Sequence, residues 1–301
     1  LSAQFVMLVS ASAISAEMLG LGCTSTAADM TFLLRKTLRD EHNHHRSTIA
    51  SGQRLPDKNI RIANMHKLKY SCELEASAHE WAQKCTANRD VNSHFGLLST
   101  SLPDVSSVRN VTAKVLQETI AKWYNNGLQA FPSDFGANSE FKVQSKYYTD
   151  ANANKKGPMM DFVKFFQVAY GQLTELGCAL NYCEKETSYP NRVILVCRYF
   201  AQIITDFDAK GVEQGTRRNG QPLVGEPLFV EGVPCIYDHQ CATFKNSSCS
   251  SFEYMCCADR RCSAYEKYTD PLYDQTKTKT AAKIVLKSVL GIVGVLLAFW
   301  I

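Results

Sequence analysis

Histidines are the first residues in this chain whose types and spacing could support chemistry. His42 and His45 stand three residues apart, so on one helix they would share a side and could chelate a metal ion. His79-Glu80 begins like the helix of a zinc protease, but Gln83 stands where such a helix needs its second histidine. We therefore expect no zinc-protease site there. Metal binding by His42 and His45 is left as an alternative to a structural role.

The cysteines are better explained as disulfides than as nucleophiles. The chain has no G-x-S-x-G element and no Walker loop. Its twelve cysteines form two sets of six, each able to close three bridges whose pairing the spacing leaves open. The sets are Cys23, Cys72, Cys85, Cys178, Cys183 and Cys197, then Cys235, Cys241, Cys249, Cys256, Cys257 and Cys262. Adjacent Cys256 and Cys257 should lead to different partners, because a bridge across one peptide bond is strained. This cysteine usage predicts an oxidising compartment.

Both ends of the sequence favour export. Residues 1–16 hold a short apolar run and the A-x-A site Ala11-Ser12-Ala13, so we interpret them as a truncated signal peptide rather than a buried first helix. Ile284 to Ile301 is apolar except for Lys287 and follows a polar stalk at 266–283. We interpret this tail as a glycosylphosphatidylinositol signal, with a membrane-spanning helix second and a core helix third. The chain is expected to be secreted and extracellular, either released or anchored at a cell surface through the tail.

Charge and sequons add two expectations. The 33 basic and 29 acidic residues are interleaved and give a net charge of +4, which does not indicate a nucleic-acid partner. Asn110 and Asn246 each begin an N-x-S/T triplet, so both are candidate glycosylation sites.

The apolar periodicity predicts an α+β protein. Helices are expected after the capping box at Thr26 to Asp29, with Met30, Leu33, Leu34 and Leu38 buried, at about 72–85, at about 111–124, and from Gly157-Pro158. The segment RVILVCRYF, at 192–200, predicts a strand buried on both faces, paired with 176–182 in a hairpin. Helices on both sides of a largely antiparallel sheet make a three-layer α-β-α sandwich the expected architecture. It is followed by a linker at 206–231 and a cysteine-rich module at 232–265.

Short motifs in a fixed order make the chain resemble the CAP superfamily, the cysteine-rich secretory, antigen-five and pathogenesis-related proteins. The likeness is closest to nematode activation-associated secreted proteins and venom-allergen-like proteins. It rests on His42-Asn43 with Arg46-Ser47, Ala63 to Tyr70, Cys72 to Glu75, Trp81 to Cys85, Gln167 to Tyr170, Leu176 to Ala179, Val196 to Tyr199 and Gly232 to Cys235. The resemblance places a CAP domain at 23–205 and implies a structural role for the segment containing His42 and His45.

The resemblance also indicates a degenerate cleft. Many family members hold two histidines and two glutamates there, a set that suits zinc-like metals. His94 fits the first histidine, whereas Arg109, Asn126 and Lys164 stand where the two glutamates and the second histidine are expected. One ligand of four binds a divalent ion poorly, so we expect no metal and no cofactor. If Arg109 and Lys164 line one groove, it would favour an anion; two solvated cations are the alternative.

The family has no established common enzymatic activity, so the resemblance implies a non-enzymatic binding protein. The leading hypothesis is a host-interaction or immune-modulating effector of a parasitic nematode that binds an unidentified host protein or receptor. The alternative is a sterol or fatty-acid carrier, with a groove lined by Phe131, Phe135, Phe141, Tyr147 and Tyr148. A hydrolase using the remnant cleft is third, and the oligomeric state is left open.

Overall fold

The structure is a computed structural model that describes residues 21–23, 29–53, 60–86, 95–130, 141–142, 158–185, 187–201, 227–244 and 246–258. The chain divides into two compact units, 1–260 and 261–301, and all described residues belong to the first. The predicted signal peptide, the stalk and the apolar tail lie outside the described residues. Within the described part, no helix is both long enough and apolar enough to cross a membrane.

The centre of the fold is a four-stranded sheet with the order β2-β4-β5-β3. Its long hairpin joins β4 (Leu173–Cys183) to β5 (Arg192–Ala201), as the sequence predicts. The edge strand β3 (Gly96–Ser101) runs antiparallel to β5, whereas the short β2 (Lys69–Tyr70) runs parallel to β4. The sheet is therefore largely antiparallel.

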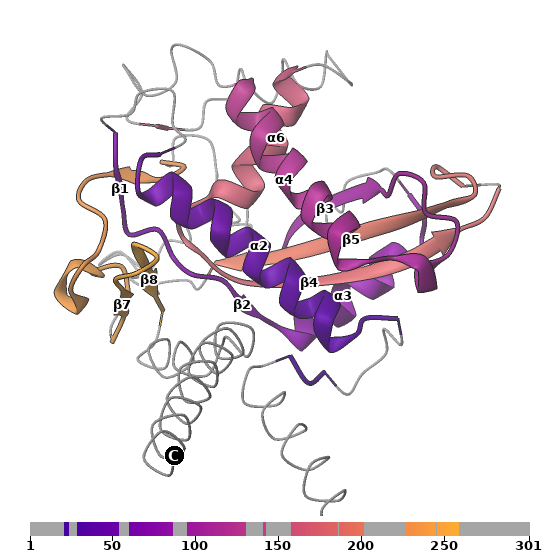
Figure 1. Cartoon of the computed structure of the whole chain (residues 1–301), viewed down its shortest axis with the longest axis horizontal. Coiled ribbons are helices and arrows are strands. Elements are labelled where there is room, and N and C mark those ends of the chain that lie inside the picture. Colours follow the sequence, from indigo (N-terminus) through magenta and orange to yellow (C-terminus); the bar gives the residue numbers. More distant parts are fainter. Residues whose placement is uncertain are drawn as a thin grey trace, which may run out of the picture. The chain divides into compact units, whose positions relative to one another are not determined.

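Alternating side chains of the hairpin enter two separate cores. On one face, Leu176, Leu180 and Leu195 join the main core, which α2 (Phe32–Ala50), α4 (Ala113–Gln129) and α6 (Pro158–Ala169) cover. On the other face, Ala179 and Val196 pack with α3 (Cys72–Ala82). These layers form the predicted three-layer α-β-α sandwich (Figure 1). The strand is apolar on both faces because both faces are covered.

The first helix begins later than its predicted capping box. Thr31 is the N-cap, and its hydroxyl accepts a hydrogen bond from the Leu34 N–H. Thr26 lies outside the described residues. Starting the helix at Phe32 leaves Leu33 59% exposed, so the prediction that Leu33 belongs to the buried stripe was wrong.

Two glycines allow close contacts between elements. A Cβ atom at Gly177 of β4 would lie 2.2 Å from the Glu75 nitrogen, so the first turn of α3 rests directly on the strand. A Cβ atom at Gly127 of α4 would lie 2.1 Å from the Phe165 Cβ, so α4 and α6 also meet closely. The second contact brings the last turn of α4 beside α6.

The cysteine-rich module packs against the sandwich within the same compact unit. It contains the hairpin of β7 (Ser248–Ser250) and β8 (Met255–Cys257) and the 3-10 helix η2 (Asp238–Gln240). Before it, β6 (Val230–Glu231) pairs with β1 (Ile62–Ala63), and Leu228 and Phe229 are buried. Residues 228–231, assigned to the linker from the sequence, are therefore part of the packed fold.

The disulfides follow the predicted division into two sets. The bridges are Cys23–Cys72, Cys85–Cys183, Cys178–Cys197, Cys235–Cys249 and Cys241–Cys256. Cys257 is also in a disulfide, and Cys262 lies outside the described residues. The adjacent cysteines Cys256 and Cys257 thus have different partners, which confirms that prediction.

Candidate functional site

The ends of α4 and α6 bring two of the predicted cleft residues together. Asn126 lies in the last turn of α4, and Lys164 lies in α6. Asp161 joins them: its carboxylate accepts a hydrogen bond from the Asn126 Nδ2 at 3.5 Å and lies 3.5 Å from the Lys164 Nζ. Because Asp161 and Lys164 are about one third exposed, this ion pair is a surface feature of small energy.

Arg109 lies elsewhere. It belongs to the 3-10 helix η1 (Val108–Asn110), which precedes α4, and its side chain is exposed. The 17 residues of α4 are about 25 Å long at 1.5 Å per residue, so Arg109 and Asn126 stand toward opposite ends of that helix. The hypothesis that Arg109 and Lys164 line one anion-attracting groove is therefore not supported by their placement. His94 lies outside the described residues.

The donors on this surface do not fit a divalent cation. An ammonium group cannot ligate a metal, and an amide with one carboxylate is a weak set. Among the described residues, one group of three His, Cys, Asp or Glu side chains has its potential ligand atoms close together. It consists of Cys235, Cys241 and Cys249. All three are in disulfides, so their sulfur atoms are not thiolates that could bind a metal.

Two of the three histidines of α2, His42 and His45, are buried and make contacts within the core. His42 is fully buried, with Nδ1 2.7 Å from the Leu38 carbonyl oxygen and Nε2 2.9 Å from the Tyr199 hydroxyl. His45 is buried in the same helix, lies 3.2 Å from the Glu41 carboxylate and stacks on Tyr124. Both His42 nitrogens are thus occupied within the core. His79 does not form a zinc pair either, because its Nε2 lies 3.1 Å from the Gln83 amide.

Arg46 is the central polar residue of the core, and the sequence patterns gave it no individual role. Its guanidinium is fully buried and donates hydrogen bonds at 2.9 to 3.2 Å to four carbonyl oxygens. They belong to His66, Val168, Tyr170 and Gly171. Burial lowers the pKa of Arg46 to about 10. One side chain of α2 therefore fixes the C-terminal end of α6, the start of β4 and the segment that leads to β2.

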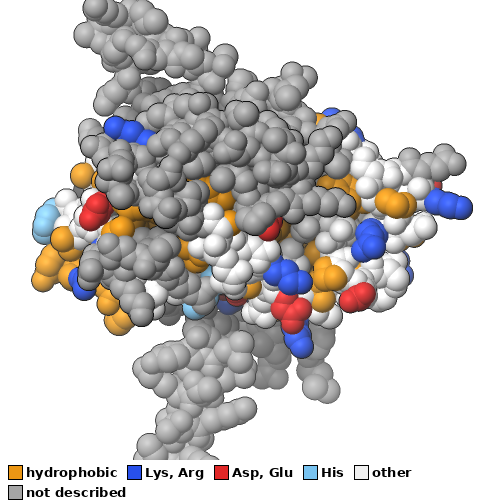
Figure 2. Space-filling view, turned by 90° about the horizontal axis from the view of Figure 1, so that it is seen from above, with side chains coloured by type: hydrophobic (Ala, Val, Ile, Leu, Met, Phe, Trp, Pro, Cys, Tyr) orange, Lys and Arg blue, Asp and Glu red, His pale blue; other side chains and the backbone are white. Residues whose placement is uncertain are grey.

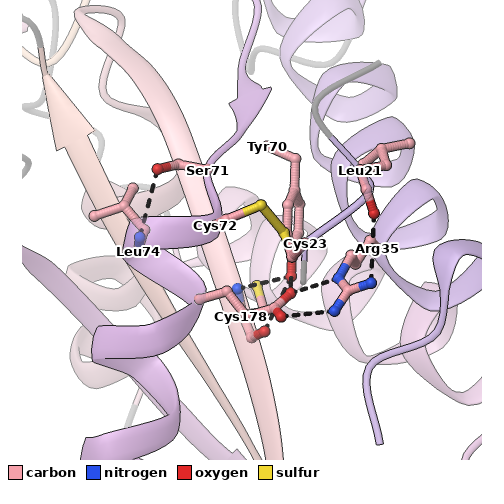
Figure 3. The surroundings of a disulfide bond; sticks show 9 residues. Leu21, Cys23, Arg35, Tyr70, Ser71, Cys72, Leu74 and Cys178 are labelled. Carbon is pink, nitrogen blue, oxygen red and sulfur yellow. Dashed lines mark hydrogen bonds and ion pairs between the residues drawn. A yellow bond between two sulfur atoms is a disulfide. The ribbon is translucent and has the colours of Figure 1, made fainter. Parts of the chain in front are cut away.

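A second buried network links α2 to α3. The Arg35 guanidinium donates two hydrogen bonds of 2.7 Å to the Glu75 carboxylate, and the Tyr70 hydroxyl donates a third at 2.6 Å. Figure 3 shows the Cys23–Cys72 disulfide beside Arg35 and Tyr70. The hydrogen bond and charge of Glu75 raise the pKa of Arg35, despite its burial. The network joins the helices on opposite faces of the sheet.

We predict acid sensitivity from two buried histidines. Burial lowers the pKa of His42 to about 3 and that of His66 to about 4, from 6.5. The His66 Nε2 has no hydrogen-bond partner among the described residues, and its ring lies against Phe244. Below about pH 6.5 the unfolded chain binds protons that the folded chain does not, so each histidine should remove about 2 kcal/mol of stability by about pH 5.

Denaturant midpoints measured between neutral pH and about pH 5 test this prediction. The variant His66→Gln should be less stable at neutral pH but lose less stability on acidification, because one titrating group is gone. His239→Gln, at an exposed position, should keep the pH dependence of the parent protein. A pH dependence unchanged in His66→Gln would show that His66 is not the cause.

The aromatic groove of the carrier hypothesis gains no support from its one described member. Phe141 is 2% exposed and lies 4.8 Å, between ring centroids, from Phe229. It is therefore part of the core. The other four aromatic residues lie outside the described residues.

Comparisons with known proteins find a family model and similar proteins that match this chain. A family model described as "CAP: Cysteine-rich secretory protein family" matches residues 39–199. The Ancylostoma secreted protein of Ancylostoma caninum is 25% identical over 232 residues, which cover 76% of this chain and 45% of that protein. Scoloptoxin SSD552 of Scolopendra dehaani is 24% identical over 60% of this chain and 74% of its own length. The chain thus spans about half of the first of these relatives.

Solved structures agree on the fold. Na-ASP-1 superposes with a TM-score of 0.53 at 23% identity, covering 78% of this chain and 49% of that one. NaASP2, solved with Zn2+, gives a TM-score of 0.50 at 18% identity over 77% of this chain and 98% of its own. The family match, the order of motifs and the sandwich agree, and this chain belongs to the CAP family, the cysteine-rich secretory proteins.

Proposed function

We propose that this chain is a secreted or surface-anchored binding protein that engages a host protein or receptor and is not an enzyme. In this role it would act as a host-interaction or immune-modulating effector of a parasitic nematode. Secretion is typical of its relatives, two of which are named as a secreted protein and a toxin. The apolar segment 284–301 would direct attachment of a glycosylphosphatidylinositol anchor that replaces it, or would itself span the membrane.

The observation that carries this proposal is the composition of the α4–α6 surface, which we define as Asn126, Asp161 and Lys164. Where a metal-holding cleft needs a carboxylate and an imidazole, this chain has an amide and an ammonium group. The charge of Lys164 is already paired with Asp161. The amide of Asn126 has no basic group that could serve as a general base, and the printed side-chain partner of both residues is the carboxylate of Asp161. The surface instead offers exposed donors and acceptors that suit a protein partner.

Affinity capture from host serum and solubilised host-cell membranes tests the proposal. The full chain should retain a defined partner, and Asn126→Ala with Lys164→Ala should retain it at least about tenfold less, since a central pair of contacts contributes one to a few kcal/mol. The matched control is Lys114→Ala, because Lys114 is 83% exposed on the first turn of the same helix.

Two outcomes would count against the proposal. Equal capture by the parent protein and the double variant would exclude the α4–α6 surface as the binding site. Hydrolytic turnover that the double variant abolishes would contradict the non-enzymatic role.

A further inference from the structure

Exposed large apolar side chains are concentrated near the cysteines of the C-terminal module. Nine such side chains occur among the described residues, and six of them lie within residues 230–254. These six, which we call the apolar set, are Val230, Val233, Ile236, Tyr237, Phe252 and Tyr254. Phe252 is 92% exposed. Figure 2 shows exposed hydrophobic side chains at its left edge, among others elsewhere on the same face. Singly exposed apolar residues are common on protein surfaces, but six within 25 residues of one disulfide-bonded module make this module a candidate surface for meeting a partner or a membrane.

The backbone that carries the apolar set is held by local bonds. The Gln240 side chain accepts hydrogen bonds from the Ile236 and Tyr237 N–H groups at 2.7 and 2.9 Å. The Asp238 carboxylate accepts one from the Cys249 N–H at 2.7 Å, and the Cys235–Cys249 bridge ties the same two segments. Phe252 and Tyr254 lie in the turn between β7 and β8. Because these positions are fixed before binding, inserting the side chains costs little conformational entropy.

The residue types favour a lipid surface. Tyrosine places an apolar ring and a polar hydroxyl at the boundary between hydrocarbon and headgroups, and Phe, Ile and Val favour the apolar side of it. Between 227 and 265 the acidic residues are Glu231, Asp238, Glu253 and Asp259, and the basic residues are Lys245, Arg260 and Arg261, so basic charge is not in excess. This stretch therefore has no basic cluster for anionic headgroups, and contact would depend on apolar insertion.

The chain sequence brings a bilayer within reach of the module. Only 25 residues separate Ala258, the last described residue, from the apolar run that starts at Ile284. Whatever conformation they adopt, they span at most about 90 Å. A bilayer that anchors the chain through this region, by 284–301 itself or by a lipid attached in its place, would thus face the module at high effective concentration.

We propose that the apolar set is a membrane-contacting surface that lays the cysteine-rich module on the bilayer to which the C-terminal region anchors the chain. This inference rests on the surface anchoring proposed above. It assigns the module a role distinct from the α4–α6 surface, which stays available for a protein partner.

Fluorescence quenching in vesicles tests this inference on the full chain. Trp300→Phe removes the tail tryptophan, and Phe252→Trp adds a reporter to the apolar set. The matched control is Tyr182→Trp in the same background, at an apolar residue of β4 that is 41% exposed. In phosphatidylcholine vesicles, brominated lipid should quench the reporter in the apolar set at least about twofold more than the control reporter, since a ring at the interface lies within reach of the bromine atoms. The Trp300→Phe chain alone gives the baseline from Trp81 and Trp123.

Flotation of the same samples separates this inference from the proposed anchoring. A chain that floats with the vesicles while both reporters are quenched equally would overturn the membrane-contacting surface and leave the anchoring intact. A chain that does not float would overturn both. Self-association without vesicles that Phe252→Ser abolishes would assign the apolar set to a second copy of the chain and would also overturn the inference.

Discussion

Replacing Arg46 with methionine is expected to lower the free energy of unfolding by about 4 kcal/mol. The substitution removes the donor that four carbonyl oxygens share, and these carbonyls belong to segments up to 125 residues away in the chain. Relief of the buried charge offsets part of the loss, because burial already lowers the pKa of Arg46. Equilibrium denaturation with disulfides intact gives the value.

Two further variants make the Arg46 prediction specific. Arg46→Lys keeps the charge, but a single ammonium group with three donors cannot span four carbonyls, so an intermediate loss is expected. Lys114→Met, on the exposed face of α4, should change the stability by less than about 0.5 kcal/mol. If Arg46→Met unfolds at the same denaturant concentration as the parent, the guanidinium does not hold these segments together.

Replacing Glu75 with leucine is expected to cost about 3 to 5 kcal/mol, because the Arg35 guanidinium and the Tyr70 hydroxyl lose their buried acceptor. The double variant Arg35→Met with Glu75→Leu should be more stable than Glu75→Leu alone, since the stranded charge is gone. A double-mutant cycle of denaturation midpoints measures the coupling.

The sign of that coupling is the informative result. If the two single losses add without interaction, the pair is not a coupled network in solution. Glu73→Leu is the matched control, because Glu73 lies two residues earlier in the same first turn of α3 and is exposed. It should leave stability nearly unchanged.

Local patterns in the sequence were sufficient to predict most of the long helices and strands. The apolar spacing in 111–124 and the Pro158 start each predict a helix that the structure contains, and the β-branched run at 192–200 predicts β5. These predictions succeed because burial on one helix face or both strand faces leaves a periodic trace in the residue types. The two sets of cysteines could be recognised because they occupy separate parts of the chain, 23–197 and 235–262.

The ends of helices and the contacts between distant residues were harder to predict from the sequence. The helix α2 starts at Phe32 because Thr31 caps it, although Thr26 to Asp29 offers a similar pattern. Leu228 and Phe229 follow a charged, Gly-rich stretch and look like linker residues until β1 is available to pair with β6. The acceptors of Arg46 lie up to 125 residues away in sequence, which no local pattern encodes.

The geometry of the candidate site could not be predicted from local sequence patterns either. Asn126 and Lys164 both contact Asp161, because Gly127 lets α4 approach Phe165 of α6, and the spacing of these residues in the sequence does not reveal the contact between the two helices. The motif order predicts Arg109 beside the cleft, but the 17 residues of α4 separate η1 from Asn126. Motif order identified the family correctly, whereas the geometry of the site required the packing of the helices.

Calorimetric titration of Zn2+ into the full chain tests most directly whether this protein recognises a partner rather than holding a catalytic metal. The account predicts no saturable binding by the parent chain, and stronger binding by the variant Asn126→Glu with Lys164→His, which supplies a carboxylate and an imidazole beside Asp161. Stoichiometric zinc binding by the parent chain that is lost on replacing Asp161 with asparagine would contradict it.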